Sequence, residues 1–402
     1  MKCFALTQSL SFAALALTSL CASVFASDDP LAPWRTSVTV SPVSEISARH
    51  TIHTYYLTNP ESPDGSKVLF YTSTSKDGHS GNLVVLDRAT QKQTIIARDI
   101  DTEDAHRAAC QQWISGGRRV AYHDVKNGRW SVHVVDLDTG RDRKLAVDRQ
   151  LCFGRAVDDI VPIYGCHWNP GVHRNLEFLN VATGEIRTVV TIADVEKRYG
   201  TWLKKEFGER TTSIFFPVIS PDGERVFFKM SAPGPDGAKN NFMSKNASTR
   251  QGTVVYDIAS GNPVFMREKW GHPAWHPDSR RMIEAGNQIF LAKDGATMTK
   301  IPGLPEMPAD HPSVSPDGKF IVKDGRLTNL GGKPDEWGVV LSDIRGGQYV
   351  VLRRFNNAGG AASWRKNHPH PIFSADSRRI YFNVNDGEWT QLYVAEAAHR
   401  DK

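Results

Sequence analysis

The 402-residue chain has no concentrated positive charge, although its formal net charge is +5. Lys and Arg outnumber Asp and Glu by 49 to 44, and the excess is spread along the chain. Proteins that bind nucleic acids usually gather such charge in a patch or stripe, so we expect no nucleic-acid partner. The hydrophobic fraction of 40% is too high for a disordered chain and too low for one that crosses a membrane repeatedly.

Long hydrophobic runs are also missing, apart from one short run near the N-terminus. The run Phe12–Leu20 follows Lys2 and precedes a small-x-small cleavage pattern at Val24–Ala26. It is too short to anchor the chain in a membrane. We therefore predict that residues 1–26 are a signal peptide and that residues 27–402 form one secreted or periplasmic domain, without a membrane span.

Cysteine is scarce, with five residues in the chain. Cys3 and Cys21 lie in the predicted signal peptide, which leaves Cys110, Cys152 and Cys166. An odd number is compatible with one disulfide and a free thiol, with three buried thiols, or with a thiolate metal ligand. No Cys-x-x-Cys pair occurs, so a zinc ribbon is disfavoured.

Several catalytic signatures are absent as well. The chain has no Gly-x-Ser-x-Gly elbow, no phosphate-binding loop and no dinucleotide-binding fingerprint. No pair of carboxylates can be identified that would serve a glycoside hydrolase.

What the chain does contain is an internal repeat, a tight turn followed by an apolar strand. The turns are Ser-Pro-Asp-Gly or close variants of it, at 62–65, 220–223, 276–279, 315–318 and 374–377, with a degenerate copy at 114–117. A second strand and turn follow each copy, as at Val254–Asp257 before Ser260-Gly261. Short strands that recur at roughly 50 residues, with turns between them, are typical of β-propellers. We predict an all-β fold, a seven-bladed β-propeller of four-stranded antiparallel blades.

Two further features complete this prediction. The last repeat stops at its third strand, and we expect the N-terminal run Thr36–Val40 to supply the missing outer strand and close the ring. Closure removes exposed sheet edges. The segment Ala193–Phe207 breaks the strand pattern and is expected to form a helix.

Histidines occupy equivalent positions in three repeats. His272, His311 and His370 each stand four residues before a turn motif, and His368 lies two residues before His370. We expect these four side chains to reach one end of the central channel, where they would suit a divalent cation. Alternatively, each histidine caps a neighbouring strand through a backbone hydrogen bond.

A second polar cluster lies in the N-terminal half. It comprises His106, His123, Tyr164, His167, His173 and Arg174, together with Trp168, which could stack on a sugar ring. The alternative is a hydrogen-bonded loop. Histidine, tyrosine and arginine suit proton abstraction next to a carboxylate, because β-elimination of a uronate needs a base, an acid and a neutralised carboxylate.

Four segments resemble the seven-bladed ulvan lyases of polysaccharide lyase family 25. They are His50–Tyr56, Glu103–Arg107, Tyr164–Gly171 and Trp270–Pro277, within a resemblance that runs from about His50 to Val394. The resemblance implies a secreted enzyme that cleaves ulvan, a sulfated acidic polysaccharide, and leaves an unsaturated uronyl end.

The resemblance also implies functional residues and a cofactor. His106, His123 and Tyr164 would be catalytic, and Arg174 would bind the uronate carboxylate, with Arg155 or Arg187 as substitutes. His167, Trp168 and His173 are assigned to substrate binding. We expect a divalent metal ion, zinc first and manganese or calcium as alternatives, at His272, His311, His368 and His370, and a monomeric protein.

Two other functions remain open. An oligogalacturonide lyase is a related propeller in which a His-x-His strand binds a catalytic cation, as His368-Pro369-His370 would, although Arg365 stands where that family has glutamine. A propeller that only binds a partner is the third interpretation. It predicts that the histidines are dispensable.

Overall fold

In a computed structural model of the chain, short antiparallel strands make up most of the fold. The structure describes residues 29–103, 106–154, 156–237, 239, 244, 246–307, 311–357 and 368–397. The predicted signal peptide therefore lies outside the described residues. None of the described helices combines the length and hydropathy that crossing a membrane requires.

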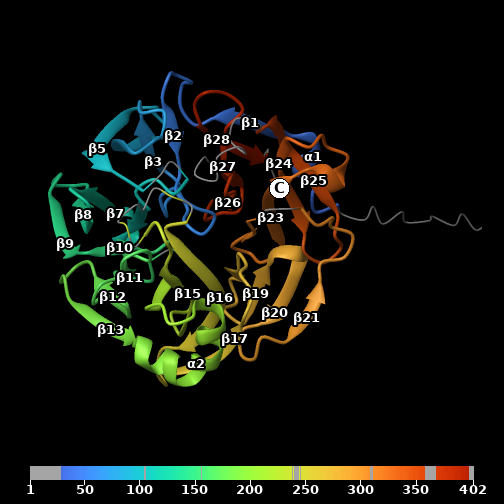
Figure 1. The fold of residues 1–402 in the computed structure, drawn as a ribbon. Helices are drawn as coiled ribbons and strands as arrows, with labels where there is room; N and C mark the ends of the chain where they lie inside the picture. The colour runs from blue at the N-terminus through green and yellow to red at the C-terminus, as the bar shows by residue number, and fades with distance from the viewer. Residues whose placement is uncertain are drawn as a thin grey trace, which may run out of the picture.

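The described strands form seven four-stranded antiparallel sheets arranged as blades around a channel (Figure 1). The seven-bladed propeller is thus confirmed. Blades 1 to 3 consist of β2 (His50–Ile52), β3 (Lys67–Ser73), β4 (Ser80–Asp87) and β5 (Gln93–Asp101); β6 (Gln112–Ile114), β7 (Arg119–Lys126), β8 (Arg129–Asp136) and β9 (Asp142–Val147); and β10 (Arg149–Leu151), β11 (Ile160–Gly165), β12 (Leu176–Asn180) and β13 (Ile186–Val190).

Blades 4 to 7 follow the same order from the channel outward. They consist of β14 (Ser213–Ile219), β15 (Arg225–Pro233), β16 (Ser248–Asp257) and β17 (Asn262–Arg267); β18 (Ala274–Trp275), β19 (Arg281–Glu284), β20 (Gln288–Leu291) and β21 (Thr297–Lys300); β22 (Ser313–Val314), β23 (Phe320–Arg326), β24 (Glu336–Asp343) and β25 (Tyr349–Asn356); and β26 (Ile372–Phe373), β27 (Arg379–Val384), β28 (Gln391–Ala397) and β1 (Val38–Pro42). Short 3-10 turns occur at Ser115–Gly117, Ala285–Asn287 and Thr328–Leu330.

The repeated turn is held by the first serine of the motif. The Ser62 hydroxyl donates to Asp64 at 2.5 Å and accepts from the backbone N–H of Lys67 at 2.9 Å. Gly65 has φ +74, a left-handed conformation that favours glycine. The serine-to-aspartate hydrogen bond recurs in the turns at 220–223, 315–318 and 374–377. One local interaction therefore starts several blades.

The ring is closed by pairing the two ends of the described chain. β1 pairs antiparallel with β28, so the expected outer strand is confirmed, with bounds two residues later than predicted. Arg379 of β27 also forms two hydrogen bonds with the buried Glu61 carboxylate of blade 1, at 2.7 and 3.0 Å. Blades 7 and 1 are thus joined by a buried ion pair as well as by packing.

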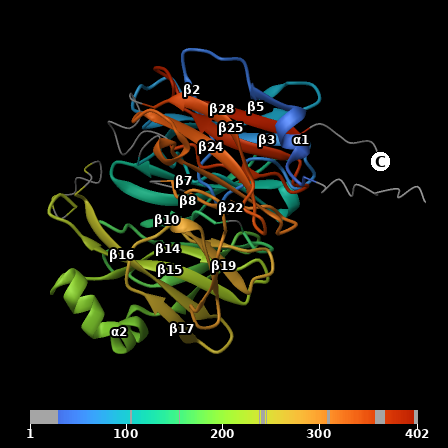
Figure 2. The ribbon, with the colours of Figure 1, turned by 90° about the vertical axis from the view of Figure 1, so that its right-hand side faces the viewer.

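The two helices lie outside the ring. The short α1 (Ala32–Thr36) precedes β1, and α2 (Ile192–Phe207) confirms the predicted helix between blades 3 and 4. Thr191 caps α2 by accepting from the backbone N–H of Asp194. The apolar side of α2 packs on blades 3 and 4, and Figure 2 shows the helix at the edge of the molecule, on the side away from α1 and β28.

Candidate functional site

Two cavities lie in the channel. The larger, about 560 Å³, is lined mainly by apolar residues and by the prolines of the repeated turns. Its one carboxylate among the described lining residues, Glu61, is bound by Arg379 and Tyr381. Consecutive tyrosines separate the cavities, since Tyr56 lines this one and Tyr55 lines the other.

The smaller cavity, about 410 Å³, carries the polar groups. Its described lining residues come from six of the seven blades or the loops that precede them: Tyr55, His106, Arg107, Phe215, Phe216, Lys229, Ser248, Arg250, Trp270, His272, His311 and His368. Histidines and cations face one volume there, and no carboxylate is among the described lining residues. Such a cavity is suited to an anionic ligand.

Three histidines meet at one side of this cavity. His106, His368 and His370 each place one ring nitrogen within 4.8 Å of a ring nitrogen of the other two. His106 and His370 have ring centroids 4.6 Å apart. The sequence had placed His106 in the catalytic set, and the fold places it with the predicted metal ligands.

The other two predicted ligands continue the cluster. The His311 ring centroid lies 4.6 Å from that of His370 and 4.4 Å from that of His272. His272, His311 and His370 each precede the innermost strand of their blade by two residues. The common position in the repeat therefore corresponds to a common place in the channel.

Asp324 of β23 holds His311 and His370 of this cluster in place through hydrogen bonds. Its fully buried carboxylate accepts from the His311 Nδ1–H at 2.9 Å, and from the backbone N–H groups of His311 and His370 at 2.9 and 2.8 Å. With Nδ1 donating, the Nε2 lone pair of His311 is available as a ligand, the arrangement common for metal-bound histidines. His370 is held at φ +48, a conformation that few side chains adopt.

The histidines are electrostatically suited to a cation. Burial, followed by the neighbouring His311 and His106, holds the pKa of His370 well below its usual value, and burial lowers the pKa of His368 to about 4. These imidazoles are therefore neutral at neutral pH, as ligands must be. Both His370 ring nitrogens are buried and have no hydrogen-bond partner among the described residues. A divalent metal ion fits this donor set.

Beside His272, the cavity is lined by aromatic and basic side chains. Lys229 Nζ lies 3.4 Å from the Trp270 ring centroid, and the Arg250 guanidinium lies 5.6 Å from it. Trp270 is 37% exposed, so part of its indole is open to a ligand. The sequence did not single out these three side chains, although a lysine within the apolar run of β15 was an available signal.

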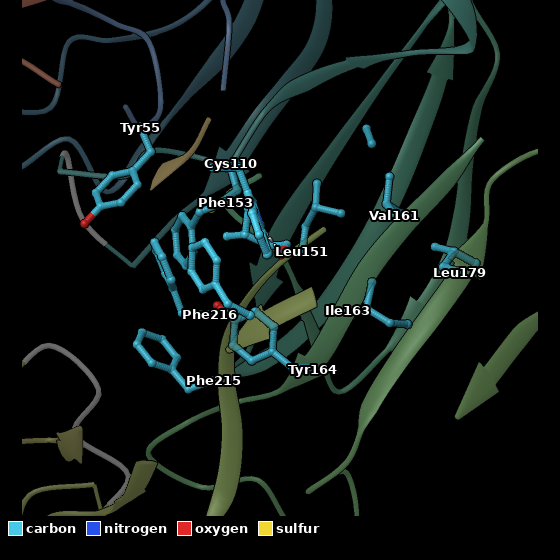
Figure 3. Close-up of a cluster of buried hydrophobic side chains, with 14 of the residues drawn as sticks. Tyr55, Cys110, Leu151, Phe153, Val161, Ile163, Tyr164, Leu179, Phe215 and Phe216 are labelled. Atoms are coloured by element: carbon cyan, nitrogen blue, oxygen red, sulfur yellow. Dashed lines mark hydrogen bonds between the residues drawn. The ribbon is translucent and has the colours of Figure 1, made fainter. Parts of the chain in front are cut away.

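Most of the second predicted cluster does not reach the cavity. His123 is buried, its Nδ1 accepts from the backbone N–H of Leu151, and burial lowers its pKa to about 3. Tyr164 is fully buried beside Phe215 and Phe216 in the hydrophobic core shown in Figure 3. Burial holds its pKa well above the usual value. The fold does not bring either predicted catalytic group to the cavity lining.

The predicted substrate-binding residues are also elsewhere. Arg174 is paired with Glu196 of α2 and donates to the Thr212 carbonyl. The half-buried His173 and buried Trp168 are not among the described lining residues. Trp168 is only 5% exposed and packs on Trp130, which leaves little of its indole open to a sugar ring.

His167 lies directly behind the cavity wall. Its Nδ1 is 2.7 Å from the hydroxyl of Ser248, which lines the cavity, and its Nε2 is 3.9 Å from Glu103. Of the substitutes for Arg174, Arg187 of β13 lies over the ring of Phe178 in β12. Arg155, the other substitute, and Arg365 lie outside the described residues. The three remaining cysteines are buried free thiols.

Comparison with known proteins agrees with this fold. An oligogalacturonate lyase from Vibrio parahaemolyticus matches with a TM-score of 0.59 and 16% identity, over 92% of this chain and 96% of that one. An oligogalacturonate lyase in complex with manganese matches equally well, over 90% and 97%. The Cps50 (Swd1) propeller domain of Myceliophthora thermophila gives 0.50 at 10% identity, over 87% and 98%. No protein-family model and no curated protein matches. At such identities the likeness shows the fold alone.

Proposed function

We propose that this protein is a polysaccharide lyase that cleaves a uronate-containing glycan by β-elimination with a divalent metal ion. The observation that carries the proposal is the single cavity that joins a histidine cluster to Lys229, Arg250 and Trp270. Two of the structures similar in fold are oligogalacturonate lyases, one of them solved with manganese, and this supports the same chemistry.

The reaction requires three functions. A base takes the C5 proton of the uronate, the electron pair forms a C4–C5 double bond, and the C4–O bond breaks as the leaving oxygen gains a proton. A bound cation would neutralise the uronate carboxylate and so acidify the C5 proton. His106, His311, His368 and His370 would hold that cation.

The remaining lining residues take the other functions. His272 lies next to His311 and Trp270 at the cavity wall, outside the three-histidine group, and we assign it as the base. Lys229 and Arg250 supply positive charge for an anionic sugar, and Trp270 supplies an aromatic face. Tyr55, which lines the same cavity, is a donor for the leaving oxygen.

Two substrates are candidates. Ulvan is favoured by the sequence segments named above, one of which brings His106 and Arg107 to the cavity. Oligogalacturonate is favoured by the names of the matched structures and by the His368–His370 pair, with manganese rather than zinc as the metal to test first. The predicted signal peptide adds the proposal that the enzyme is secreted or periplasmic and acts there.

The test is ultraviolet absorbance of the new double bond, measured for the purified protein with each glycan. The metal-free protein, the protein with Mn²⁺, Zn²⁺ or Ca²⁺, and His272→Ala are compared, with His133→Gln as a control in blade 2, where the His133 ring bonds Ser131 and Asp142 and does not line the cavity. We expect metal-dependent product with one glycan, a loss of about two orders of magnitude or more in His272→Ala, and none in the control. If neither glycan gives product with any metal, a binding propeller is the better interpretation.

A further inference from the structure

The cavity wall next to His272 contains a lysine in an unusual place. Lys229 lies in the middle of β15 and is fully buried. Burying an ammonium group is costly unless it finds partners, so its partners indicate what it does. The hydrogen-bond partner and the nearest ring belong to the segment Trp270-Gly271-His272, which enters blade 5, and the Phe216 ring centroid lies 5.3 Å away.

Lys229 contacts this segment twice. Its Nζ donates a short hydrogen bond to the Gly271 carbonyl and lies 3.4 Å from the Trp270 ring centroid. Both contacts fix the segment from the side of blade 4.

Glu284, at the end of β19, holds the same segment from blade 5. Its carboxylate packs against Gly271 and so faces the peptide that joins Gly271 to His272. The fit is close, because a Cβ on Gly271 would lie 2.2 Å from Glu284 Oε1. Only glycine leaves room for the carboxylate there.

We propose that Lys229 and Glu284 are positioning residues that clamp the Gly271–His272 peptide from two sides, Lys229 through the Gly271 carbonyl and Glu284 by packing on Gly271. The clamp fixes the Trp270 indole and the His272 imidazole, both of which line the cavity. Its consequence for turnover depends on the proposed lyase function, whereas its effect on the segment does not. Glu284 contacts the segment at Gly271, and its charge also interacts with that of Lys229.

Hydrogen exchange of the His272 amide tests the clamp without any activity. In the full chain we expect slow exchange, faster by about tenfold or more in Glu284→Ala and Lys229→Met. Glu284→Gln retains the shape of the side chain that packs on Gly271 and should restore most of the protection. Gly271→Ala must displace the carboxylate and should act like Glu284→Ala.

Lys323→Met is the matched control. Lys323 is equally buried in β23 of blade 6, but its Nζ donates to Asn287 rather than to the segment. Unchanged His272 exchange in both Lys229→Met and Glu284→Ala would overturn the proposal. Equal acceleration in Lys323→Met would also overturn it, because the effect would then be general destabilisation.

Activity separates the two proposals. If the wild-type protein is a lyase, kcat should fall about tenfold or more in Lys229→Met and Glu284→Ala, while Glu284→Gln keeps most of it. Mn²⁺ affinity measured by calorimetry should stay unchanged. If the wild-type protein has no lyase activity, the function fails, and the exchange experiment still decides whether the clamp exists. Weaker Mn²⁺ binding in Lys229→Met would contradict a role outside the metal site.

Discussion

Asp324→Asn tests whether the histidine cluster is a metal site built on a buried carboxylate. The substitution keeps the shape of the side chain but replaces one acceptor oxygen by an amide donor. Asp324 accepts three hydrogen bonds, two from His311 and one from His370. Whichever way the amide turns, at least one of these donors then faces another donor.

The magnitude follows from the position of the aspartate behind the ligands. Removing a group that orients a metal-bound histidine typically lowers metal affinity by about 10- to 100-fold. That corresponds to about 1.4 to 2.7 kcal/mol. A lost buried hydrogen bond to a charged group costs a further ~1.5 to 3 kcal/mol of folding stability. We therefore expect weaker metal binding together with a lower melting temperature.

The assay is calorimetric titration with Mn²⁺ and Zn²⁺, with thermal melting measured in parallel. Asp124→Asn is the matched control, since Asp124 is a buried aspartate of blade 2 that accepts from the backbone N–H of Asp101, outside the histidine cluster. A metal affinity in Asp324→Asn equal to that of the wild-type protein would refute the reasoning, even if the melting temperature falls.

Three further predictions concern ring closure, acid stability and the cavity wall. Arg379→Met leaves the buried Glu61 carboxylate without its cation and should lower the free energy of unfolding by about 3 to 5 kcal/mol in denaturant titration. The Ser62 hydroxyl lowers the pKa of Asp64 to about 2, so this carboxylate stabilises the fold above its unfolded pKa of about 4. That small contribution is lost as the pH falls toward 2, and Asp64→Asn should show a smaller drop in melting temperature over the same range. Trp270→Ala should raise KM for the glycan more than Trp270→Phe does, in steady-state kinetics.

Each of these has a clear contrary result. Arg129→Met removes an exposed ion pair with Asp148 and should lower the free energy of unfolding by less than about 1 kcal/mol. If Arg379→Met lowers it by no more than this, the ion pair between Arg379 and Glu61 has no special role in ring closure. Identical acid transitions in wild type and Asp64→Asn would show that the turn carboxylate is not linked to folding. An unchanged KM in Trp270→Ala would remove the indole from substrate binding.

The repeat made the architecture predictable, because each blade begins with a local turn. A serine, an aspartate and a glycine within four residues specify that turn without help from distant residues. The position of His272, His311 and His370 relative to it followed from the same register. The regular position of these histidines in the repeat therefore predicted that their side chains lie close together in the fold.

Apart from His106, the residues of the second cluster do not line the cavity, and the physical reason is different. In β11 every residue from Val161 to Gly165 is buried, because neighbouring blades cover both faces of the strand. Alternation of polar and apolar residues then carries no information about which face meets the channel. Tyr164 is a polar aromatic residue with a core position, and no local signal distinguished it from a catalytic one.

Lys229 and Asp324 were missed because their roles depend on contacts between separate parts of the chain. Lys229 meets a segment more than forty residues later, and Asp324 meets backbone from two blades. Lys229 and Asp324 are both buried charged residues that follow a run of apolar residues in their strands. A buried charge among apolar neighbours is a useful sign of function, but its partners become visible only in the fold.

Ring closure and the histidine cluster depend on the same blade. His368 and His370 precede blade 7, whose outer strand comes from the N-terminal end of the described chain. Asn383 of that blade also bonds both backbone groups of His53, next to the tyrosines that separate the cavities. A cation bound by His370 of blade 7 and His106 of blade 2 would join elements on either side of the closure. It would bind the closed ring and not the unfolded chain, so occupancy of the site stabilises the closed ring by mass action. The residues that would hold the metal are thereby placed where binding and closure reinforce each other.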